Sequence, residues 1–316
     1  MSNEDKALSA VRARLRLLRL PLAPTAVADV SAGYLCVRAL DGRPVEAGPF
    51  ALLAGAALCF YGGGMTLNDA FDAERDRALH PERPIPSGAV SRESAFAQGA
   101  LLLAAGMGLA ALAGPPHGLI AVALAVAILL YDGLLKRLAI PGALAMGLCR
   151  YLDVQLGAGF AAGAKFPPAA LLGAYIVGVT FISTLEERPD DAPKLRAAVY
   201  GLLFLLFGGG MLMPYPMAAA WALAPAAFLV ALLGMRAVHL GTRDAVKRLV
   251  LALLLAIFLV DAGSLAGHRL YAWGVGAAAL GLAFPLLARI ASVRMTPRTK
   301  PEAERWGKRE RSGSSS

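Results

Sequence analysis

Long apolar runs separated by short polar turns make up most of the chain. Most of these runs are long enough to cross the apolar layer of a membrane as a helix. Proline and glycine end several of them, as at Pro141-Gly142 and Pro167-Pro168. The expected segments are 20–37, 49–67, 93–114, 117–132, 139–162, 168–185, 197–214, 216–235, 249–267 and 271–288. The pattern predicts an all-α, polytopic membrane bundle of nine to ten transmembrane helices.

Small residues are frequent inside the apolar segments, with Gly62-Gly63-Gly64 the plainest case. Glycine and alanine let membrane helices approach closely, so we expect a tight bundle around a central cavity. Composition supports the same class, because 57% of the residues are hydrophobic and only 17% are charged. Soluble globular proteins carry more charge.

The basic residues predict an orientation. If the N-terminus is cytoplasmic and ten segments span, most lysines and arginines fall on the cytoplasmic side, as the positive-inside rule requires. Both termini and the acidic loops described below are then cytoplasmic. The net charge of +9 is explained by this topology and by attraction to anionic lipid, and nucleic-acid binding is a poor alternative. Three regions are expected: a basic N-terminal segment (1–19), a transmembrane domain (20–290) and a disordered basic tail (291–316).

An acidic stretch follows the second apolar segment directly, where a membrane helix meets water. Asp69, Asp72 and Asp76 are three and four residues apart, so on a helix they share one face. Carboxylates gathered in this way suit Mg²⁺, which binds through one or two carboxylates together with substrate phosphates. Asn68 is expected to be a neutral hydrogen-bonding partner. The alternative is an acidic, solvated helix end.

A second acidic stretch follows the sixth apolar segment, from Ser183 to Asp191. Four segments separate the two stretches, so both are expected on the same side, facing each other over one cavity. Glu186 and Asp190 are the candidate metal ligands here. Two facing acidic sites with lysine and arginine nearby suit a diphosphate bridged by magnesium ions. The alternative is an ordinary polar connection.

Charged residues inside apolar segments are costly and usually face a cavity or a partner. Arg150 and Asp153 are three residues apart, so they can pair on one helix face. The pair either acts on substrate, with Arg150 at a diphosphate and Asp153 at an acceptor, or locks two helices together. Asp261 is expected in helix packing. Tyr131 is a candidate to face a carbocation through its ring, although packing is the commoner role for such residues.

Several motifs resemble the UbiA-type intramembrane prenyltransferases. The first is Asn68-Asp69-x-x-Asp72-x-x-x-Asp76 followed by Arg83-Pro84-Ile85-Pro86-Ser87-Gly88. Tyr131-x-x-x-x-Lys136-Arg137 is similar to the family's tyrosine–lysine element, and Met146-Gly147-x-Cys149-Arg150 to its fifth helix. The family's second motif, Asp-x-x-Asp-x-x-x-Asp, falls on Ser183, Glu186 and Asp190, so its first acid is lost. This eroded motif is similar to that of the EboC-like branch.

The resemblance implies a function. The first motif would bind an isoprenoid diphosphate through Mg²⁺, Lys136 would reach the phosphates, and Asp29 would line the acceptor pocket. The expected activity is Mg²⁺-dependent transfer of a prenyl group to a lipophilic acceptor within the membrane. The alternative is a non-catalytic relative that binds or translocates a lipophilic or isoprenoid-linked precursor. Lys136 has its own alternative role, as an anchor to lipid headgroups.

Overall fold

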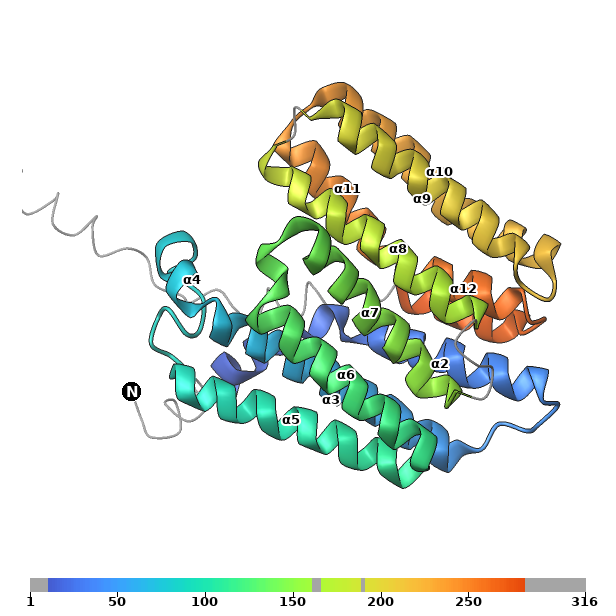
Figure 1. The fold of residues 1–316 in the computed structure, drawn as a ribbon, viewed down its shortest axis with the longest axis horizontal. Coiled ribbons are helices and arrows are strands. Elements are labelled where there is room, and N and C mark those ends of the chain that lie inside the picture. The colour runs from blue at the N-terminus through green and yellow to red at the C-terminus, as the bar shows by residue number, and fades with distance from the viewer. Residues whose placement is uncertain (1–10, 161–165, 189–190, 282–316) are drawn as a thin grey trace, which may run out of the picture.

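A computed structural model describes residues 11–160, 166–188 and 191–281. Every regular element in these ranges is a helix, which confirms the all-α class (Figure 1). The longer helices are α2 (Ala23–Leu40), α3 (Ala47–Phe71), α5 (Arg92–Ala113), α6 (Pro115–Gly133), α7 (Ala139–Ala158), α8 (Pro167–Thr184), α9 (Ala192–Met211), α10 (Pro216–Leu240), α11 (Arg243–Leu255) and α12 (Ile257–Ala266). The shorter ones are η1 (Leu20–Leu22), α4 (Ala73–Leu79), η2 (Leu135–Arg137) and η3 (Leu185–Glu187).

Each of the ten predicted segments contains a helix in the described residues, and the differences are short stretches at segment ends and one turn residue, Ala256. Eight spans in the described ranges are long and apolar enough to cross a membrane, and α11 with α12 forms one of them. The fifth predicted segment is α7, a 20-residue helix that carries Arg150 and Asp153 and is not among these eight spans. The tenth is helical over residues 271–281, and its expected remainder lies outside the described residues.

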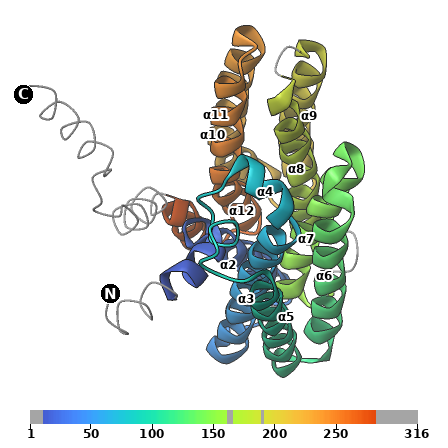
Figure 2. The ribbon, with the colours of Figure 1, turned by 90° about the vertical axis from the view of Figure 1, so that its left-hand side faces the viewer.

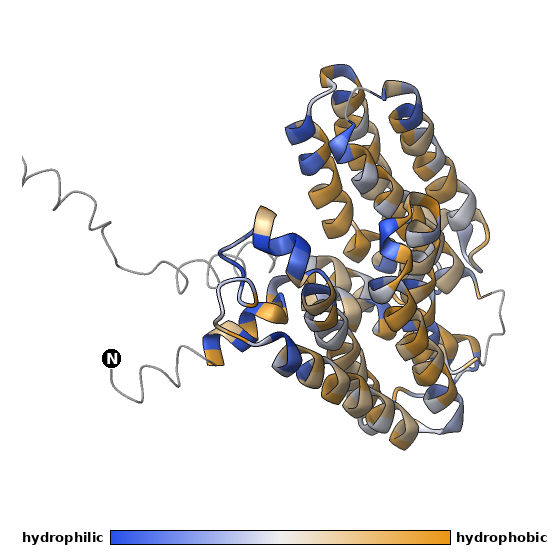
Figure 3. Ribbon diagram, turned by 60° about the vertical axis from the view of Figure 1, so that its left-hand side comes forward, coloured by the Kyte–Doolittle hydropathy of each residue, from blue (hydrophilic) through white to orange (hydrophobic). Residues whose placement is uncertain are grey.

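The outer faces of the bundle are apolar, as expected of an integral membrane protein. Phe204, Trp221 and Leu112 expose 78%, 76% and 75% of their surface. Figure 3 shows hydrophobic residues along the long helices, with hydrophilic residues concentrated at the helix ends. Such an outward apolar surface is stable only against lipid, since a soluble protein rarely exposes large apolar patches.

Helices α2 and α7 form the centre of the bundle. α7 packs against α2, α6 and α8, and α2 also contacts α3 and α12. The remaining helices divide around this centre, with α3, α5 and α6 on one side and α8 to α12 on the other (Figures 1 and 2). The two groups face each other, and this arrangement positions the site described below.

Glycine allows the closest helix contacts. A Cβ atom on Gly33 of α2 would collide with the carbonyl oxygen of Val154 on α7, and one on Gly157 with that of Val30. The expected tight packing is therefore present, but it is closest between α2 and α7. The triple glycine contributes at Gly63, where an added Cβ would lie 3.0 Å from Leu103 on α5.

One end of the bundle collects α4, η2, η3 and the turn before α11; we call it the polar end. Arg75 lies 3.5 Å from Glu187, and Arg243 lies 3.2 Å from Glu186. These contacts confirm that the two acidic stretches share one end. The cytoplasmic location of this end stays a prediction. The expected disordered tail (291–316) and most of the N-terminal segment lie outside the described residues.

Candidate functional site

The first acidic stretch lies where α3 ends at Phe71, at the polar end. Asp72 joins α3 to α4 with φ −88° and ψ 1°. Amide hydrogen bonds continue across the joint, since Asp72 N donates to Asn68 O (3.0 Å) and Asp76 N donates to Asp72 O (2.9 Å). The chain therefore bends at Asp72 without unwinding, and the three aspartates do not lie along one straight helix face.

Asp69 and Asp76 point to the same arginine. Arg83 Nη1 lies 2.7 Å from Asp76 Oδ2 and 4.0 Å from Asp69 Oδ1. Asp69 also accepts a hydrogen bond from Arg19 Nη2 at 2.6 Å. Both aspartates are buried, with 5% and 4% of their surface exposed. A buried carboxylate without a partner is costly, so Arg19 and Arg83 stabilise the charged forms of these two aspartates.

The motif from Arg83 to Gly88 is a compact turn that places Arg83. Ser87 N donates to Arg83 O and Gly88 N donates to Ile85 O, each at 3.0 Å. Gly88 has φ +75°, which glycine adopts without the steric penalty of a side chain. Ile85 packs into a small apolar cluster with Leu17 and Ala73. The motif thus anchors one arginine under the acidic stretch.

Asp72 has a different cation. Lys136 Nζ, from η2, lies 2.8 Å from Asp72 Oδ2 and donates to Asn68 O at 3.3 Å. The Lys136 side chain is only 10% exposed. It is therefore directed into the protein toward the acidic stretch, and this placement does not fit a lipid-headgroup anchor.

The structure does not gather Asp69, Asp72 and Asp76 into one cluster, and their role as magnesium ligands stays a prediction. Within the described residues, no group of three acidic, histidine or cysteine side chains is placed to hold a metal ion. Each aspartate has a cation from another part of the chain, which offsets the repulsion between the three carboxylates.

A cavity of about 820 Å³ opens beside Asp72; we call it the polar cavity. Asn68 and Ser183 line it, and its opposite wall is apolar, with Val179 of α8 and Leu254 of α11. Its charged lining residues are Arg19, Asp72, Glu74, Arg75, Arg92, Lys136, Arg137 and Arg150. Cations outnumber carboxylates in this list, so the cavity favours a polyanion.

The acidic side chains that the structure describes in the second stretch do not line the polar cavity. Ser183 lines it, but Glu186 lies 3.2 Å from Arg243 and 3.7 Å from Lys247, and is not among the lining residues. Asp191 caps α9 by accepting from Lys194 N, and Lys194 Nζ lies 2.6 Å from its carboxylate. Asp190 lies outside the described residues. Glu186 is therefore paired with cations of α11 outside the polar cavity, and the pair of Glu186 and Asp190 as metal ligands stays a prediction.

The intramembrane charges form a buried cluster between α2, α7 and α12. Arg150 Nη1 lies 3.8 Å from Asp153 Oδ2, as the spacing predicted, but only 2.6 Å from Asp29 Oδ2. Arg150 Nη2 also donates to Thr25 Oγ1 at 3.2 Å. Asp261 of α12 is buried and interacts electrostatically with Asp29, which is fully buried. Asp29 thus holds Arg150 between α2 and α7, and its expected place in the acceptor pocket stays a prediction.

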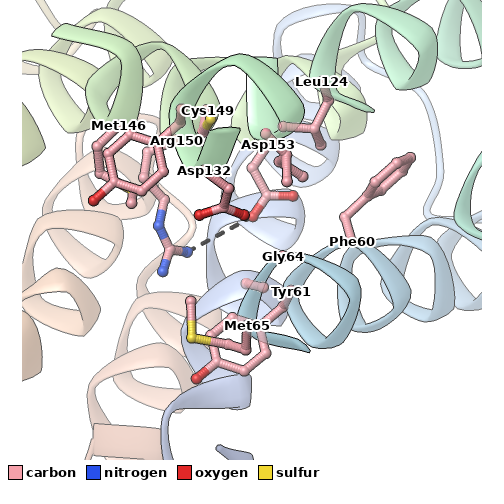
Figure 4. A pocket seen from close by; sticks show the side chains of 13 residues that line it. Phe60, Tyr61, Gly64, Met65, Leu124, Asp132, Met146, Cys149, Arg150 and Asp153 are labelled. Carbon is pink, nitrogen blue, oxygen red and sulfur yellow. Dashed lines mark ion pairs between the residues drawn. The ribbon is translucent and has the colours of Figure 1, made fainter. Parts of the chain in front are cut away.

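A second, smaller pocket of about 80 Å³ adjoins the polar cavity; we call it the inner pocket (Figure 4). Tyr61, Met65, Tyr131, Met146 and Arg150 line both spaces. The inner pocket is otherwise mostly apolar and contains Asp153 in its wall. The structure therefore brings Tyr131, Arg150 and Asp153 together in the wall of the inner pocket, which adjoins the polar cavity.

Asp132 is a site residue that the sequence reasoning missed. It lines the inner pocket, is 3% exposed, and accepts a hydrogen bond from Asn68 Nδ2 at 2.9 Å. It follows Tyr131 directly and ends an apolar segment, so an intramembrane carboxylate beside a motif residue was the available signal.

The residues at the polar cavity fit a magnesium ion bound together with phosphates. Asp72 and Glu74 provide carboxylates to this space, and Asn68 provides an amide. Mg²⁺ commonly uses one or two carboxylates and completes its shell with substrate phosphates and water. The donor set thus suits an ion that arrives with a diphosphate, rather than one held by protein ligands alone.

Comparison with known proteins identifies the class of protein. The UbiA prenyltransferase family matches residues 30–240, and the chain belongs to this family. The apo structure of a UbiA homologue from Aeropyrum pernix K1 has the same fold, with a TM-score of 0.60 at 21% identity, covering 76% of this chain and 96% of that one. A solved digeranylgeranylglyceryl phosphate synthase structure gives 0.56 at 20% identity, covering 82% and 98%.

A curated relative is more similar in sequence over a shorter stretch. The digeranylgeranylglyceryl phosphate synthase of Ignicoccus hospitalis is 38% identical over 141 residues, which are 45% of this chain and 45% of that protein. The match therefore spans less than half of that relative's length.

Proposed function

We propose that this chain is a magnesium-dependent intramembrane prenyltransferase that moves a prenyl group from an isoprenoid diphosphate to a lipophilic acceptor. The observation that carries the proposal is that the polar cavity and the inner pocket adjoin each other. The polar cavity is mainly cationic, with Asp72 and Asn68 in its wall, and the inner pocket is mostly apolar. A molecule with a charged head and a hydrocarbon chain fits both at once.

The chemistry follows from charge. As the C1–O bond of the diphosphate breaks, its electron pair leaves with the diphosphate, and positive charge develops on C1. Lys136, Arg19 and Arg150 line the cavity and would stabilise the leaving group. Magnesium, when bound, would neutralise the phosphate oxygens through Asp72 and Asn68. The apolar inner pocket would keep water from the developing carbocation.

The acceptor is proposed to carry a phosphate. The name of the Ignicoccus relative describes a phosphate-bearing glyceryl lipid as its product. In this chain, Arg75, Arg92 and Arg137 line the polar cavity in addition to the cations nearest Asp72. These arginines would bind a second anionic group once the diphosphate occupies Lys136. Geranylgeranylglyceryl phosphate is therefore the first acceptor to test.

The experiment uses the protein purified in detergent. Binding of farnesyl and geranylgeranyl diphosphate and release of diphosphate are measured with and without magnesium and acceptor. Asp72→Asn is compared with Asp41→Asn, a matched change at the far end of α2. We expect magnesium-dependent release that Asp72→Asn abolishes and Asp41→Asn leaves intact.

Two other outcomes would contradict the proposal. Tight binding without release, even with acceptor present, would favour the non-catalytic carrier. The placement of Glu186 outside the cavity is the observation on which that second reading depends. If neither isoprenoid diphosphate bound in a magnesium-dependent way, the proposed transferase activity would be excluded.

A further inference from the structure

Tyr61 is one of the residues that line both the inner pocket and the polar cavity. It lies near the middle of α3. Figure 4 shows its ring beside Met65, with the hydroxyl pointing away from Asp132 and Asp153. That hydroxyl donates a hydrogen bond to the backbone oxygen of Arg19 at 3.0 Å. The Tyr61 side chain therefore connects the inner pocket to the segment that precedes α2.

Arg19 has an unusual backbone conformation. Its φ is +45° and its ψ is +46°, in the left-handed region where a residue with a side chain is strained. This conformation turns the chain from the helical residues 11–17 into η1. The Arg19 oxygen accepts from Leu22 N at 3.2 Å as well as from the Tyr61 hydroxyl. A strained backbone persists only where surrounding contacts hold it, and the Tyr61 hydroxyl is one such contact.

The conformation of Arg19 matters because of where its side chain lies. Arg19 Nη2 is 2.6 Å from Asp69 Oδ1, and the side chain lines the polar cavity and is 42% exposed. A guanidinium has five N–H donors in a rigid fork, and a single carboxylate oxygen does not use them all. The exposed part can therefore bind a phosphate group in the cavity while Asp69 keeps the guanidinium oriented.

We propose that Tyr61 is a positioning residue for the diphosphate, an inference that rests on the proposed function. Its hydroxyl holds the Arg19 backbone in the left-handed conformation, and that conformation directs the guanidinium to the diphosphate. The ring of Tyr61 stays in the wall of the inner pocket, beside the space for the prenyl chain. One side chain therefore borders the chain of the donor and fixes a cation at its charged head.

The alternative role of Tyr61 depends on its ring. An aromatic face can stabilise the positive charge that develops on C1 of the prenyl chain. That role requires the ring and does not require the hydroxyl. Tyr61→Phe keeps the ring and removes only the hydrogen bond to the Arg19 backbone, so this substitution separates the two roles.

The probe for the test is inorganic diphosphate, which carries the charge of the donor and has no chain. Its Kd in the presence of magnesium is measured by isothermal titration calorimetry with the protein in detergent. Tyr61→Phe should weaken binding about three- to tenfold, the range expected of one net hydrogen bond. Tyr200→Phe, a matched change at an exposed tyrosine of α9, should leave the Kd unchanged. Geranylgeraniol, which has a chain and no charge, should bind the wild type and Tyr61→Phe alike.

A double-mutant cycle tests whether Tyr61 acts through Arg19. Arg19→Gln should weaken diphosphate binding more than Tyr61→Phe does, and in that background Tyr61→Phe should change the Kd less than about twofold. Additive losses would overturn the proposal. An unchanged diphosphate Kd in Tyr61→Phe, even with a lowered unfolding midpoint, would also overturn it, because the hydroxyl would then only stabilise the fold. If Arg19→Gln fails to fold, the comparison of inorganic diphosphate with geranylgeraniol decides.

These binding measurements do not depend on turnover. Weaker binding of geranylgeraniol with unchanged binding of inorganic diphosphate would assign Tyr61 to the prenyl chain and overturn the proposal. A wild type that binds inorganic diphosphate but transfers no prenyl group would contradict the proposed function, and the Kd values would still decide the role of Tyr61. A wild type that binds no inorganic diphosphate would overturn both.

Discussion

The two acidic stretches look alike in sequence and differ in the fold. In the first, Asp69 is 5% exposed and Asp76 is 4% exposed, and Asp72 borders the polar cavity beside Lys136. In the second, the Glu187 side chain is 71% exposed, and Glu186 pairs with arginine and lysine outside the cavity. Both stretches follow a membrane helix, so local position does not account for the difference.

The cations that surround each stretch account for it. The first emerges among Arg19, Arg83 and Lys136, which come from three separate parts of the chain and enclose it. The second emerges beside α11, whose Arg243 and Lys247 are more than half exposed and hold Glu186 outside the polar cavity. Enclosed ion pairs are desolvated and geometrically fixed, whereas exposed pairs contribute little. An acidic motif therefore becomes a site only where its partners bury it.

The largest loss of stability is expected for the fully buried charges in the centre of the bundle. Arg150→Met would leave Asp29 and Asp153 without their cation, as well as removing the donor to Thr25. Breaking a buried pair from one side costs about 3–5 kcal/mol. Thermal unfolding in detergent should show a clear loss of stability, and Arg243→Met at the exposed pair should not. Equal unfolding midpoints for the two variants would show that burial of the ion pair does not set its contribution to stability.

At the polar cavity, Lys136→Gln should reduce magnesium-dependent diphosphate release about 100-fold. The change removes a cation facing the leaving group and also the partner of Asp72, and one electrostatic contact of this kind is worth about 10²–10³ in rate. The matched control is Lys194→Gln, which removes the exposed partner of Asp191. If both variants lose activity alike, enclosure is not what distinguishes the two stretches.

Glu186→Gln tests whether the second acidic stretch takes part in magnesium binding. Because Glu186 lies outside the polar cavity, its loss should change diphosphate release less than about threefold. The stability change should be within about 1 kcal/mol, the range of an exposed ion pair. Titration of magnesium with wild type and variant, at fixed geranylgeranyl diphosphate, measures this directly. A magnesium affinity weakened tenfold would restore Glu186 as a metal ligand.

The smallest effect concerns Asp191, where the Lys194 side chain lowers the pKa of the carboxyl below its ordinary value. A depressed folded pKa contributes stability above the unfolded pKa, and that contribution is lost as pH falls through the folded value. The difference in unfolding midpoint between wild type and Asp191→Asn should therefore be small at neutral pH and vanish in acid. A difference that grows as pH falls would reverse the sign.

Much of the fold was predictable because a membrane helix is recognisable from a continuous stretch of sequence. Each predicted segment corresponds to a helix in the described residues, since a long apolar run must satisfy its backbone internally when it lies in lipid. The pairing of Arg150 with Asp153 was predictable for the same reason, as both residues share one turn of one helix. The placement of the first acidic stretch at a helix end followed from the boundary of its apolar run.

The site depended on contacts between residues far apart in the chain. Asp29 with Arg150, Asn68 with Asp132 and Arg19 with Asp69 join separate elements, and no periodicity predicts them. The bend at Asp72 and the cations of α11 decided which carboxylates face the cavity. The helices and the polar side chains available at their ends could be predicted from local sequence alone. The tertiary structure decided the partners, because a charge pairs with the nearest opposite charge in space, whatever its distance along the chain.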